Sequence, residues 1–461
     1  MNKMTRTAAA VAALFATMLA GCVSFAPTHE RPAAPVASAW PAPAAASGAA
    51  AAELSWQNFY ASDARLRDLI ELALQNNRDL RVAVLNVEQA RALARVADAS
   101  RLPTVSAGFS SSRLPGQNET ITSNYQAGLQ ISAYELDLFG KIKNQSDAAT
   151  ARYLASAEGS RASQISLVAG VASSYLALQA DEELLGLTRQ TLATREESLR
   201  LTQLKFDAGA TSQLDFNSAE SAAASARATL AQAKRQRAQD ENALVLLLGQ
   251  PLPANLPAGA SLAGLSLPDV PAGLPSEVLV NRPDVLQAEA QLSAADANIG
   301  AARAAFFPSI SLTTSLGTAS SQLSALFSNT AWSFASQVLL PIFDSGRNTA
   351  NLASAKAAQG IAVAQYEKAV QTAFREVADA LAGRATFGDQ SAALADQARA
   401  EGERLRLVDL RYKNGASNSL ELLDAQRAAF AAQQALVQVR LAQLLNSVQL
   451  YKALGGGVTK G

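Results

Sequence analysis

The sequence is poor in the residues from which most catalytic and metal sites are built. Its 461 residues include one histidine, His29, and one cysteine, Cys22. This scarcity excludes most metal sites, a cysteine nucleophile apart from Cys22, and any disulfide within the chain. No Ser/His/Asp set can be assembled, because His29 lies in a proline-rich N-terminal segment, and no glycine motif for binding phosphate is present. Paired Asp and Glu residues remain open to a hydrolase, although carboxylates on helix surfaces are usually solvated.

Net charge, aromatic residues and long apolar runs are scarce as well. Lys plus Arg and Asp plus Glu number 39 each, so the charge gives no indication of a nucleic-acid partner. Aromatic residues make up 6% of the chain and hydrophobic residues 49%, many of them alanine, which favours long and closely packed helices. Beyond the N-terminal segment, no window holds the roughly 20 apolar residues of a membrane-spanning helix. Any passage through a membrane must therefore be made by β-strands.

The first 21 residues are typical of a secretion signal. Lys3 and Arg6 form the basic region, and residues 8–20 form a short apolar core. Leu19-Ala20-Gly21-Cys22 follows and resembles the bacterial lipobox. In such signals the cysteine receives a covalent diacylglycerol, and an N-acyl lipid after cleavage. We therefore expect residues 1–21 to be a lipoprotein signal peptide. A plain signal peptide with a chance cysteine is the alternative.

Residues 22–60 are then a lipid-anchored N-terminal tether. Prolines and alanines dominate residues 26–52, which predicts a flexible segment. Val23 follows Cys22 where lipoproteins held at the inner membrane carry Asp, so sorting to the outer membrane is favoured. No other cofactor is expected.

The remainder of the chain repeats itself as two halves. Four pairs of segments correspond in the same order, the third with one residue of slippage: Asn77-Arg78-Asp79 with Asn281-Arg282-Pro283-Asp284, Gly140-Lys141 with Gly346-Arg347, Leu102–Ser106 with Phe307–Ser311, and Phe206–Thr211 with Tyr412–Ser417. Such ordered correspondence implies a duplicated unit. We place the halves at 61–250 and 276–455, joined by a Pro/Gly-rich linker at 251–275 and followed by a tail at 456–461.

Each half is predicted to run from helix through two strands to a long helical hairpin. Apolar residues at three-to-four spacing predict helices over 62–101 and 276–306, each ended by a proline. Alternation of apolar with small polar residues then predicts strands near 103–113, 123–137, 309–317 and 331–343. Long helices follow at about 140–205 and 346–411, and each turns at a glycine, Gly209 or Gly415. The returning helices are expected over 213–248 and 418–453.

The strands could belong to a soluble antiparallel sheet, which shows the same alternation, or to a transmembrane barrel. The lipidated N-terminus and the flanking helices favour the barrel. Four strands cannot enclose a pore, whereas three copies supply twelve. We therefore expect an α+β membrane protein: a homotrimeric 12-stranded β-barrel, four strands per chain, continued by a long periplasmic α-helical barrel. A soluble coiled-coil hairpin is the alternative for the helices taken alone.

Several segments resemble the TolC family of outer-membrane efflux proteins, and in particular the lipoprotein branch typified by OprM and NodT. The matching segments are Asn281–Val285, Ala288-Glu289-Ala290, Ile299–Ile310, Tyr134–Lys141, Leu340–Arg347 and Phe374–Leu381. The resemblance covers roughly residues 54–455. It implies a homotrimer in the outer membrane that docks onto a periplasmic adaptor (a membrane fusion protein) and an inner-membrane pump of the resistance-nodulation-division (RND) type. Such a channel is a passive exit duct for small molecules such as drugs, and not an enzyme.

Carboxylates stand just past each glycine turn and are the candidate gate. They are Asp215 in the first half and Glu421 and Asp424 in the second, the last two sharing one helix face. The resemblance implies that these acids line a closed periplasmic tip and that Tyr412 helps to hold it shut, although Ser417 stands where some members carry a basic residue. A threefold ring of carboxylates predicts a cation-selective resting pore. Acids at helix starts also favour the helix dipole, which is the alternative.

Two other functions stay open. A duct for protein secretion of type I belongs to the same family, although the lipobox and Arg282-Pro283-Asp284 favour the multidrug branch. A helical scaffold lipoprotein without a pore would lack membrane strands. The exported compounds and the cognate pump are not readable from the sequence.

Overall fold

The computed structural model describes residues 24–41, 51, 53–115, 121–257 and 259–457. Cys22 and the signal segment lie outside these residues. The chain divides into two compact units, which are described separately. The first comprises residues 1–33, 85–158 and 286–368, and the second residues 34–84, 159–285 and 369–461.

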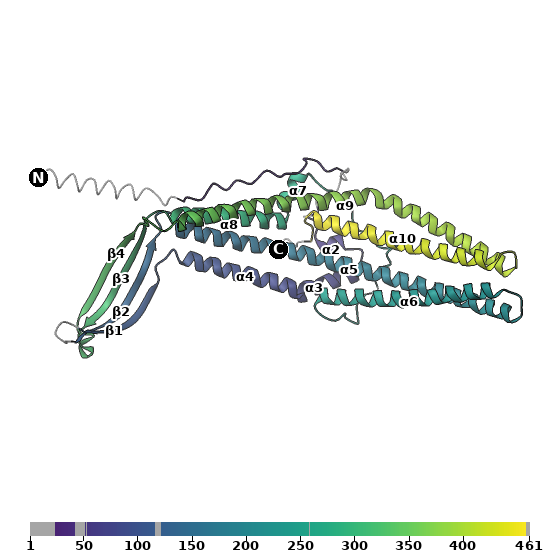
Figure 1. Ribbon diagram of the computed structural model, residues 1–461, viewed down its shortest axis with the longest axis horizontal. Helices are drawn as coiled ribbons and strands as arrows, with labels where there is room; N and C mark the ends of the chain where they lie inside the picture. The colour runs from purple at the N-terminus through teal and green to yellow at the C-terminus, as the bar shows by residue number, and fades with distance from the viewer. Residues whose placement is uncertain (1–23, 42–50, 52, 116–120, 258, 458–461) are drawn as a thin grey trace. The chain divides into compact units, whose positions relative to one another are not determined.

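The first unit contains one antiparallel sheet of four strands in the order β1-β2-β3-β4. The strands are β1 (Val105–Pro115), β2 (Ile121–Leu136), β3 (Ser309–Ser320) and β4 (Thr330–Leu339), and Figure 1 shows them side by side. All four predicted strands are confirmed. Their bounds differ from the expected ones by a few residues, and β4 ends at Leu339 because Pro341, which lacks a backbone N–H, follows shortly.

Side chains of opposite character occupy the two sides of this sheet. In one cross-strand row Ala107, Leu129, Leu316 and Trp332 lie opposite one another, and in the next row Ser106, Gln130, Ser315 and Ser333 do. We call the side with Leu129 the apolar face and the side with Gln130 the polar face. Every residue of β1 and nearly every residue of β4 is exposed, so no core covers either outer strand within the described residues.

The alternation predicted for β2 is wrong at its end. Strict alternation would place Ala133 on the apolar face with Leu129 and Ile131. The pairing of β2 with β3 instead shifts between Ile131 and Tyr134, and Ala133 adopts a φ of 51° at this bulge. An extra residue in one strand reverses which side the following residues occupy, so Tyr134 takes the apolar face and Glu135 the polar face. Thr313 accepts the freed backbone N–H of Ala133 at 3.1 Å.

The central strands approach closely at two glycines. Gly128 of β2 lies opposite Gly317 of β3. A Cβ atom on Gly128 would stand 2.4 Å from the Leu316 carbonyl oxygen, and one on Gly317 would stand 2.1 Å from that of Ala127. Only glycine permits this approach of two backbones.

Long helices form most of the rest of the chain. They are α5 (Lys141–Asp207) and α9 (Arg347–Lys413), each of 67 residues, and the returning helices α6 (Gln213–Leu248) and α10 (Ser419–Ala453). These match the four predicted helices closely. At a rise of about 1.5 Å per residue, 67 residues extend about 100 Å. No helix among the described residues has the length and apolar character needed to cross a membrane.

The two helices predicted at the start of the halves are each broken once. The first divides into α3 (Ala64–Asn76) and α4 (Arg78–Ala99), and the second into α7 (Pro275–Asn281) and α8 (Pro283–Ala304). Asn77 ends α3 in an extended conformation, and its side chain caps α4 by accepting the N–H of Leu80 at 2.8 Å. Arg282 is extended because Pro283 follows it, and a residue before proline avoids the helical conformation.

The prediction of a flexible tether over residues 26–52 is wrong for the described residues 26–41. In the first unit His29 binds Asp296 at 2.8 Å, and Arg31 forms two hydrogen bonds with Glu289. In the second unit Trp40 stacks on Phe374 and donates to the Gly273 carbonyl at 2.9 Å. A proline-rich composition disfavours helices and strands in this segment. It does not prevent side chains of the segment from binding to other parts of the chain.

The Pro/Gly-rich linker also contributes to a core. Leu262, Leu265 and Val270 are buried with a short helix, α2 (Trp56–Phe59), in the largest apolar cluster of the second unit. In the same cluster Phe59 stacks on Tyr451 with ring centroids 3.9 Å apart. Residues 53–60, expected to be tether, are therefore part of the folded unit.

Candidate functional site

Two turns of the same construction form the ends of the helical hairpins in the second unit. Gly209 has a φ of 69° and Gly415 a φ of 72°, a left-handed conformation that favours glycine. In each turn the N–H of the following alanine bonds back to a carbonyl five residues earlier, Ala210 to Lys205 and Ala416 to Arg411. The predicted glycine turns are therefore confirmed.

The next helix begins with a side-chain cap in both hairpins. Ser212 accepts the N–H of Asp215 at 3.1 Å, and Asn418 accepts the N–H of Glu421 at 2.8 Å. Asp215 and Glu421 thus occupy the same position in the first turn of α6 and α10, where a carboxylate favours the helix dipole. An acid at the start of any surface helix would have the same cap and the same position near the helix dipole. The other contacts of these acids therefore decide whether they form a gate.

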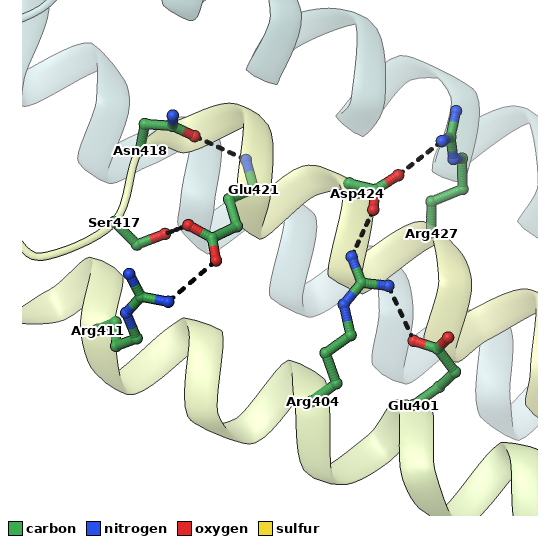
Figure 2. A network of polar contacts seen from close by, with 8 residues as sticks. All are labelled: Glu401, Arg404, Arg411, Ser417, Asn418, Glu421, Asp424 and Arg427. Atoms are coloured by element: carbon green, nitrogen blue, oxygen red, sulfur yellow. Dashed lines mark hydrogen bonds and ion pairs between the residues drawn. The ribbon is translucent and has the colours of Figure 1, made fainter.

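Glu421 and Asp424 are both paired with arginines of their own hairpin (Figure 2). Arg411 reaches Glu421 at 3.2 Å, and Ser417 donates to the other carboxylate oxygen. Glu421 therefore has a basic partner although residue 417 is a serine. Arg411 supplies the positive charge from the last turn of α9, before the Gly415 turn.

Asp424 has two arginine partners. Arg404 binds one carboxylate oxygen and Arg427 the other, the latter at 2.7 Å, and Arg404 also binds Glu401 at 3.0 Å (Figure 2). The hydrogen bonds from Arg404 and then Arg427 lower the pKa of Asp424. Three carboxylates and three guanidinium groups (those of Arg404, Arg411 and Arg427) face one another here, so the cluster is close to charge balance.

Asp215 joins the two hairpins. Its carboxylate accepts hydrogen bonds from Ser419, at the start of α10, and from Ser212 at 2.7 Å and Thr211 at 3.1 Å. These bonds, that from Ser419 foremost, lower the pKa of Asp215 to about 2. Asp215 is therefore ionised at any physiological pH.

Tyr412 provides a second link between the hairpins. The Lys205 ammonium, near the end of α5, stands 4.4 Å from the centre of the Tyr412 ring, within the range of a cation–π contact. On its own hairpin Tyr412 packs beside a small apolar cluster of Val408, Leu422 and Ala425. The four predicted gate residues thus all lie at the hairpin ends, and two of them bridge the hairpins.

Sequence reasoning missed the partners of these residues. Arg404, Arg411, Arg427, Lys205 and Ser419 were not singled out. A signal was available for two of them, since Arg404 and Asp424 stand nearly equally far before and after the Gly415 turn, as do Arg411 and Glu421. Residues at equal distance from a hairpin turn come to lie side by side on the two helices.

Comparison with known proteins extends over both halves of the chain. A family model described as outer membrane efflux protein matches residues 69–250 and 274–456. The antibiotic efflux pump outer membrane protein ArpC of Pseudomonas putida is 47% identical over 96% of this chain and 94% of its own length. The outer membrane protein OprJ of Pseudomonas aeruginosa is 45% identical over 99% of this chain and 98% of its own length.

A solved structure is similar to this chain over nearly its whole length. The open state of the MtrE outer membrane channel of Neisseria gonorrhoeae shares 42% identity with a TM-score of 0.88, over 94% of this chain and 98% of that chain. The likeness indicated by the motifs is thereby confirmed: the chain belongs to the outer membrane efflux protein family and is an outer-membrane channel for efflux.

Proposed function

We propose that three copies of this chain form the exit duct of a tripartite efflux system, with a twelve-stranded barrel in the outer membrane. The observation that carries this proposal is the uncovered apolar face of the sheet. Trp332 is 76% exposed and Phe334 63% exposed, and Leu129 and Leu316 stand in the same row as Trp332. A soluble sheet buries its apolar face against a core, whereas a barrel presents it to lipid.

The polar face supports an aqueous lumen. Its serines and glutamines can bond to water, and Ser315 and Ser333 bond to each other at 2.7 Å. Small molecules are the class of cargo we propose, since ArpC carries antibiotic efflux in its name. The duct contributes passage and no catalytic step. Its partners are a periplasmic adaptor and an RND-type inner-membrane pump, which open the tip on docking.

A strain that lacks its own efflux channel tests the assembly and its function together. Expression of this chain with the adaptor and pump of the same genome should restore export of a fluorescent dye such as ethidium. Omission of this chain should abolish export while the pump is still present in the membrane. Restored export by adaptor and pump alone would show that the chain is not the exit duct.

Lipid attachment at Cys22 is the proposed anchor of the N-terminus. Phe25 stacks on Phe307 at 4.6 Å, and Arg303 donates to the Phe25 carbonyl, so the chain is fixed beside the end of α8 three residues after Cys22. Mass spectrometry of the mature N-terminus should find a diacylglycerol and an N-acyl chain on Cys22. An unmodified peptide beginning elsewhere would contradict the anchor.

The barrel should hold the protein in the membrane without that lipid. A Cys22→Ser variant that reaches the outer membrane should still need detergent for extraction. Release into buffer would instead favour a helical scaffold tethered only by its lipid.

The hairpin ends are the proposed gate, with Asp215, Glu421, Asp424 and Tyr412 as its residues. In this arrangement the hydrogen bond from Ser419 to Asp215 and the contact of Lys205 with Tyr412 hold the two hairpins of a chain together. Opening requires the hairpins to separate, so these links stabilise the closed state.

Removal of the paired carboxylates tests this gate. Glu421→Ala with Asp424→Ala leaves Arg404, Arg411 and Arg427 without those partners. Resting single-channel conductance in a planar bilayer should rise, and cation selectivity should fall because positive charge is exposed. The control is Asp396→Ala with Glu403→Ala, which removes two carboxylates paired only along α9. Equal conductance and selectivity of the two double variants would show that Glu421 and Asp424 are ordinary surface residues of the helix.

A further inference from the structure

A buried glutamine interrupts the apolar face of α10. The buried residues of this helix that lie nearest the Gly415 turn are Leu422, Ala425, Gln426, Ala429 and Ala432. Gln426 is 5% exposed and has the single polar side chain in this described stretch. Glutamines are mostly exposed in folded proteins, because a buried amide must find partners for its carbonyl and amino groups.

The Gln426 amide finds one such partner, and that partner lies on the other hairpin. Its Nε2 atom donates to the Ser198 hydroxyl of α5 at 3.3 Å, which is longer than the roughly 2.7–3.2 Å typical of such bonds. Its Oε1 atom is buried and accepts no hydrogen bond from any residue that the structure describes. The amide therefore links the two hairpins while its carbonyl group is left unpaired.

The next hydroxyl along α5 does not pair with this carbonyl group. Thr202, one helical turn after Ser198, is 3% exposed, and its hydroxyl donates to the Ser198 carbonyl at 2.8 Å. In the first hairpin Glu220 stands as far after Gly209 as Gln426 stands after Gly415, and Glu220 is exposed. Burial of a polar side chain at this place is therefore particular to the second hairpin.

The burial of this amide favours separation of the hairpins. When α10 moves away from α5, water reaches both ends of the amide and satisfies them. When the hairpins are closed, Oε1 has lost its water and has gained no donor. An unpaired buried acceptor costs more free energy than one long hydrogen bond contributes. An apolar side chain of the same size would instead stabilise the closed hairpins.

We propose that Gln426 is a positioning residue that weakens the closed state of the gate. This inference rests on the gate proposed above, and it gives Gln426 an effect opposite in sign to that of the Ser419 hydrogen bond. A docking partner can shift a two-state equilibrium only by the difference between its affinities for the two states. A less stable closed state is therefore opened by a smaller difference in affinity.

Two substitutions at this contact should change the gate in opposite directions. Gln426→Met keeps an unbranched side chain of similar length without polar groups, and methionine adapts to irregular packing. This substitution should stabilise the closed state. Ser198→Ala removes the one partner of the amide and leaves the amide buried, so it should destabilise the closed state.

Resting conductance in a planar bilayer measures both effects. The Ser419→Ala variant provides a raised starting conductance, because it lacks the hydrogen bond to Asp215. In this background Gln426→Met should lower the mean resting conductance several-fold, and Ser198→Ala should raise it. Gln433→Met is the control and should change nothing, since Gln433 is an exposed residue of the same helix. Gln426→Leu replaces Gln426→Met if the yield of folded trimer falls.

The outcomes separate the role of Gln426 from the gate itself. A rise with Gln426→Met as well as with Ser198→Ala would reveal an ordinary stabilising link and overturn the inference. An unchanged conductance with Gln426→Met, where Ser419→Ala alone raises it, would also overturn the inference and leave the gate standing. An unchanged conductance with Ser419→Ala would overturn the gate and, with it, the role of Gln426.

Discussion

At the scale of single residues, the partner of a charged group decides what the group can do. Asp215 and Glu421 share a place in the first turn of a helix and Asp424 stands three residues after Glu421, yet only Asp215 is held by the other hairpin, through Ser419. Glu421 and Asp424 are neutralised by arginines of their own hairpin. A carboxylate ring is therefore a weaker source of cation selectivity than the sequence suggested.

The link through Asp215 is expected to persist in acid. A carboxyl whose folded pKa is lowered contributes stability above its unfolded pKa of 3.8, and that contribution is lost only as the pH falls through about 2. The resting conductance of the channel should therefore show no change due to Asp215 between pH 7 and pH 4. A rise in that interval that Asp215→Asn abolishes would contradict this prediction.

Loss of the donor should loosen the same link at any pH. Ser419→Ala should raise resting single-channel conductance in a planar bilayer, because the hydrogen bond that joins α6 to α10 is removed. Ser218→Ala is the matched control, since the Ser218 hydroxyl bonds only to the Leu214 carbonyl of its own helix. An equal effect of the two substitutions would show that Ser419 has no special role.

A buried arginine fixes the junction of α7 and α8. The Arg282 side chain is 7% exposed and donates to the Ala453 carbonyl at 2.7 Å, to Asp284 and to Glu376. Burial alone would lower its pKa, but the bonds and charges of Asp284 and Glu376 outweigh burial and raise it. The guanidinium fork suits three simultaneous partners in a way that a lysine ammonium does not.

Arg282→Met should therefore destabilise the second unit. Removal of one member of a buried ion pair costs about 3–5 kcal/mol, and we expect roughly 2–3 kcal/mol because Asp284 and Glu376 reach solvent. Thermal unfolding of the detergent-purified protein measures this as a fall in Tm. Arg399→Met, which removes an exposed pair with Asp396, should cost less than about 1 kcal/mol.

At the scale of the elements, close approach and pairing limit what can be substituted. Gly317→Ala should disrupt the pairing of β2 with β3, because the added Cβ would lie 2.1 Å from the Ala127 carbonyl oxygen. Gly108→Ala is the control, since its nearest neighbour would be the Gln130 side-chain nitrogen at 3.7 Å. The temperature at which trimers dissociate on a gel should fall for the first variant only. Similar falls for both would show that the close approach does not matter.

A pair of carboxyl groups makes the first long hairpin sensitive to pH. Burial raises the pKa of Asp181 on α5 to about 7, and the hydrogen bond and charge of Asp240 on α6 add to the effect, with Glu182 raising and Arg237 lowering it. A raised folded pKa contributes stability that is full below the unfolded pKa of 3.8 and is lost as the pH rises to about 7.

Contact between α5 and α6 should accordingly weaken as the pH rises from about 4 to about 7. Hydrogen exchange of amides near Asp181, corrected for intrinsic rates, should show faster opening at pH 8 in the natural protein. Asp181→Asn should remove this difference. Asp147→Asn should not, because Asp147 is an exposed residue that pairs with Lys143. Retention of the pH effect in Asp181→Asn would assign it to another group.

At the scale of the whole molecule, the membrane distinguishes the two faces of the sheet. Leu129→Arg places a charge on the apolar face and should cost about 2–4 kcal/mol near the middle of the bilayer. Gln130→Arg places the same charge on the polar face and should be much milder. The yield of folded trimer in outer membranes and its stability to denaturant measure the difference. Equal damage at the two positions would contradict a barrel.

The sequence by itself determined the order of the four strands and the four long helices. The change from a three-to-four spacing to strict alternation marks each passage from helix to strand. These signals are local: a few consecutive residues carry them, and the side chain of a strand residue must point to one side or the other. The duplication, the glycine turns and the family motifs are likewise properties of the linear chain.

Only the tertiary structure decided features that depend on distant partners. The bulge at Ala133 exists because β2 must stay in register with β3. Residues 26–41 have a defined conformation because side chains in this segment contact Asp296, Glu289 and Phe374. The candidate gate is close to charge balance because arginines pair with its carboxylates. One of them, Arg404, is 20 residues away from Asp424 along the chain, on the other side of the Gly415 turn. A linear pattern records what a residue can do, whereas the fold selects which partner it meets.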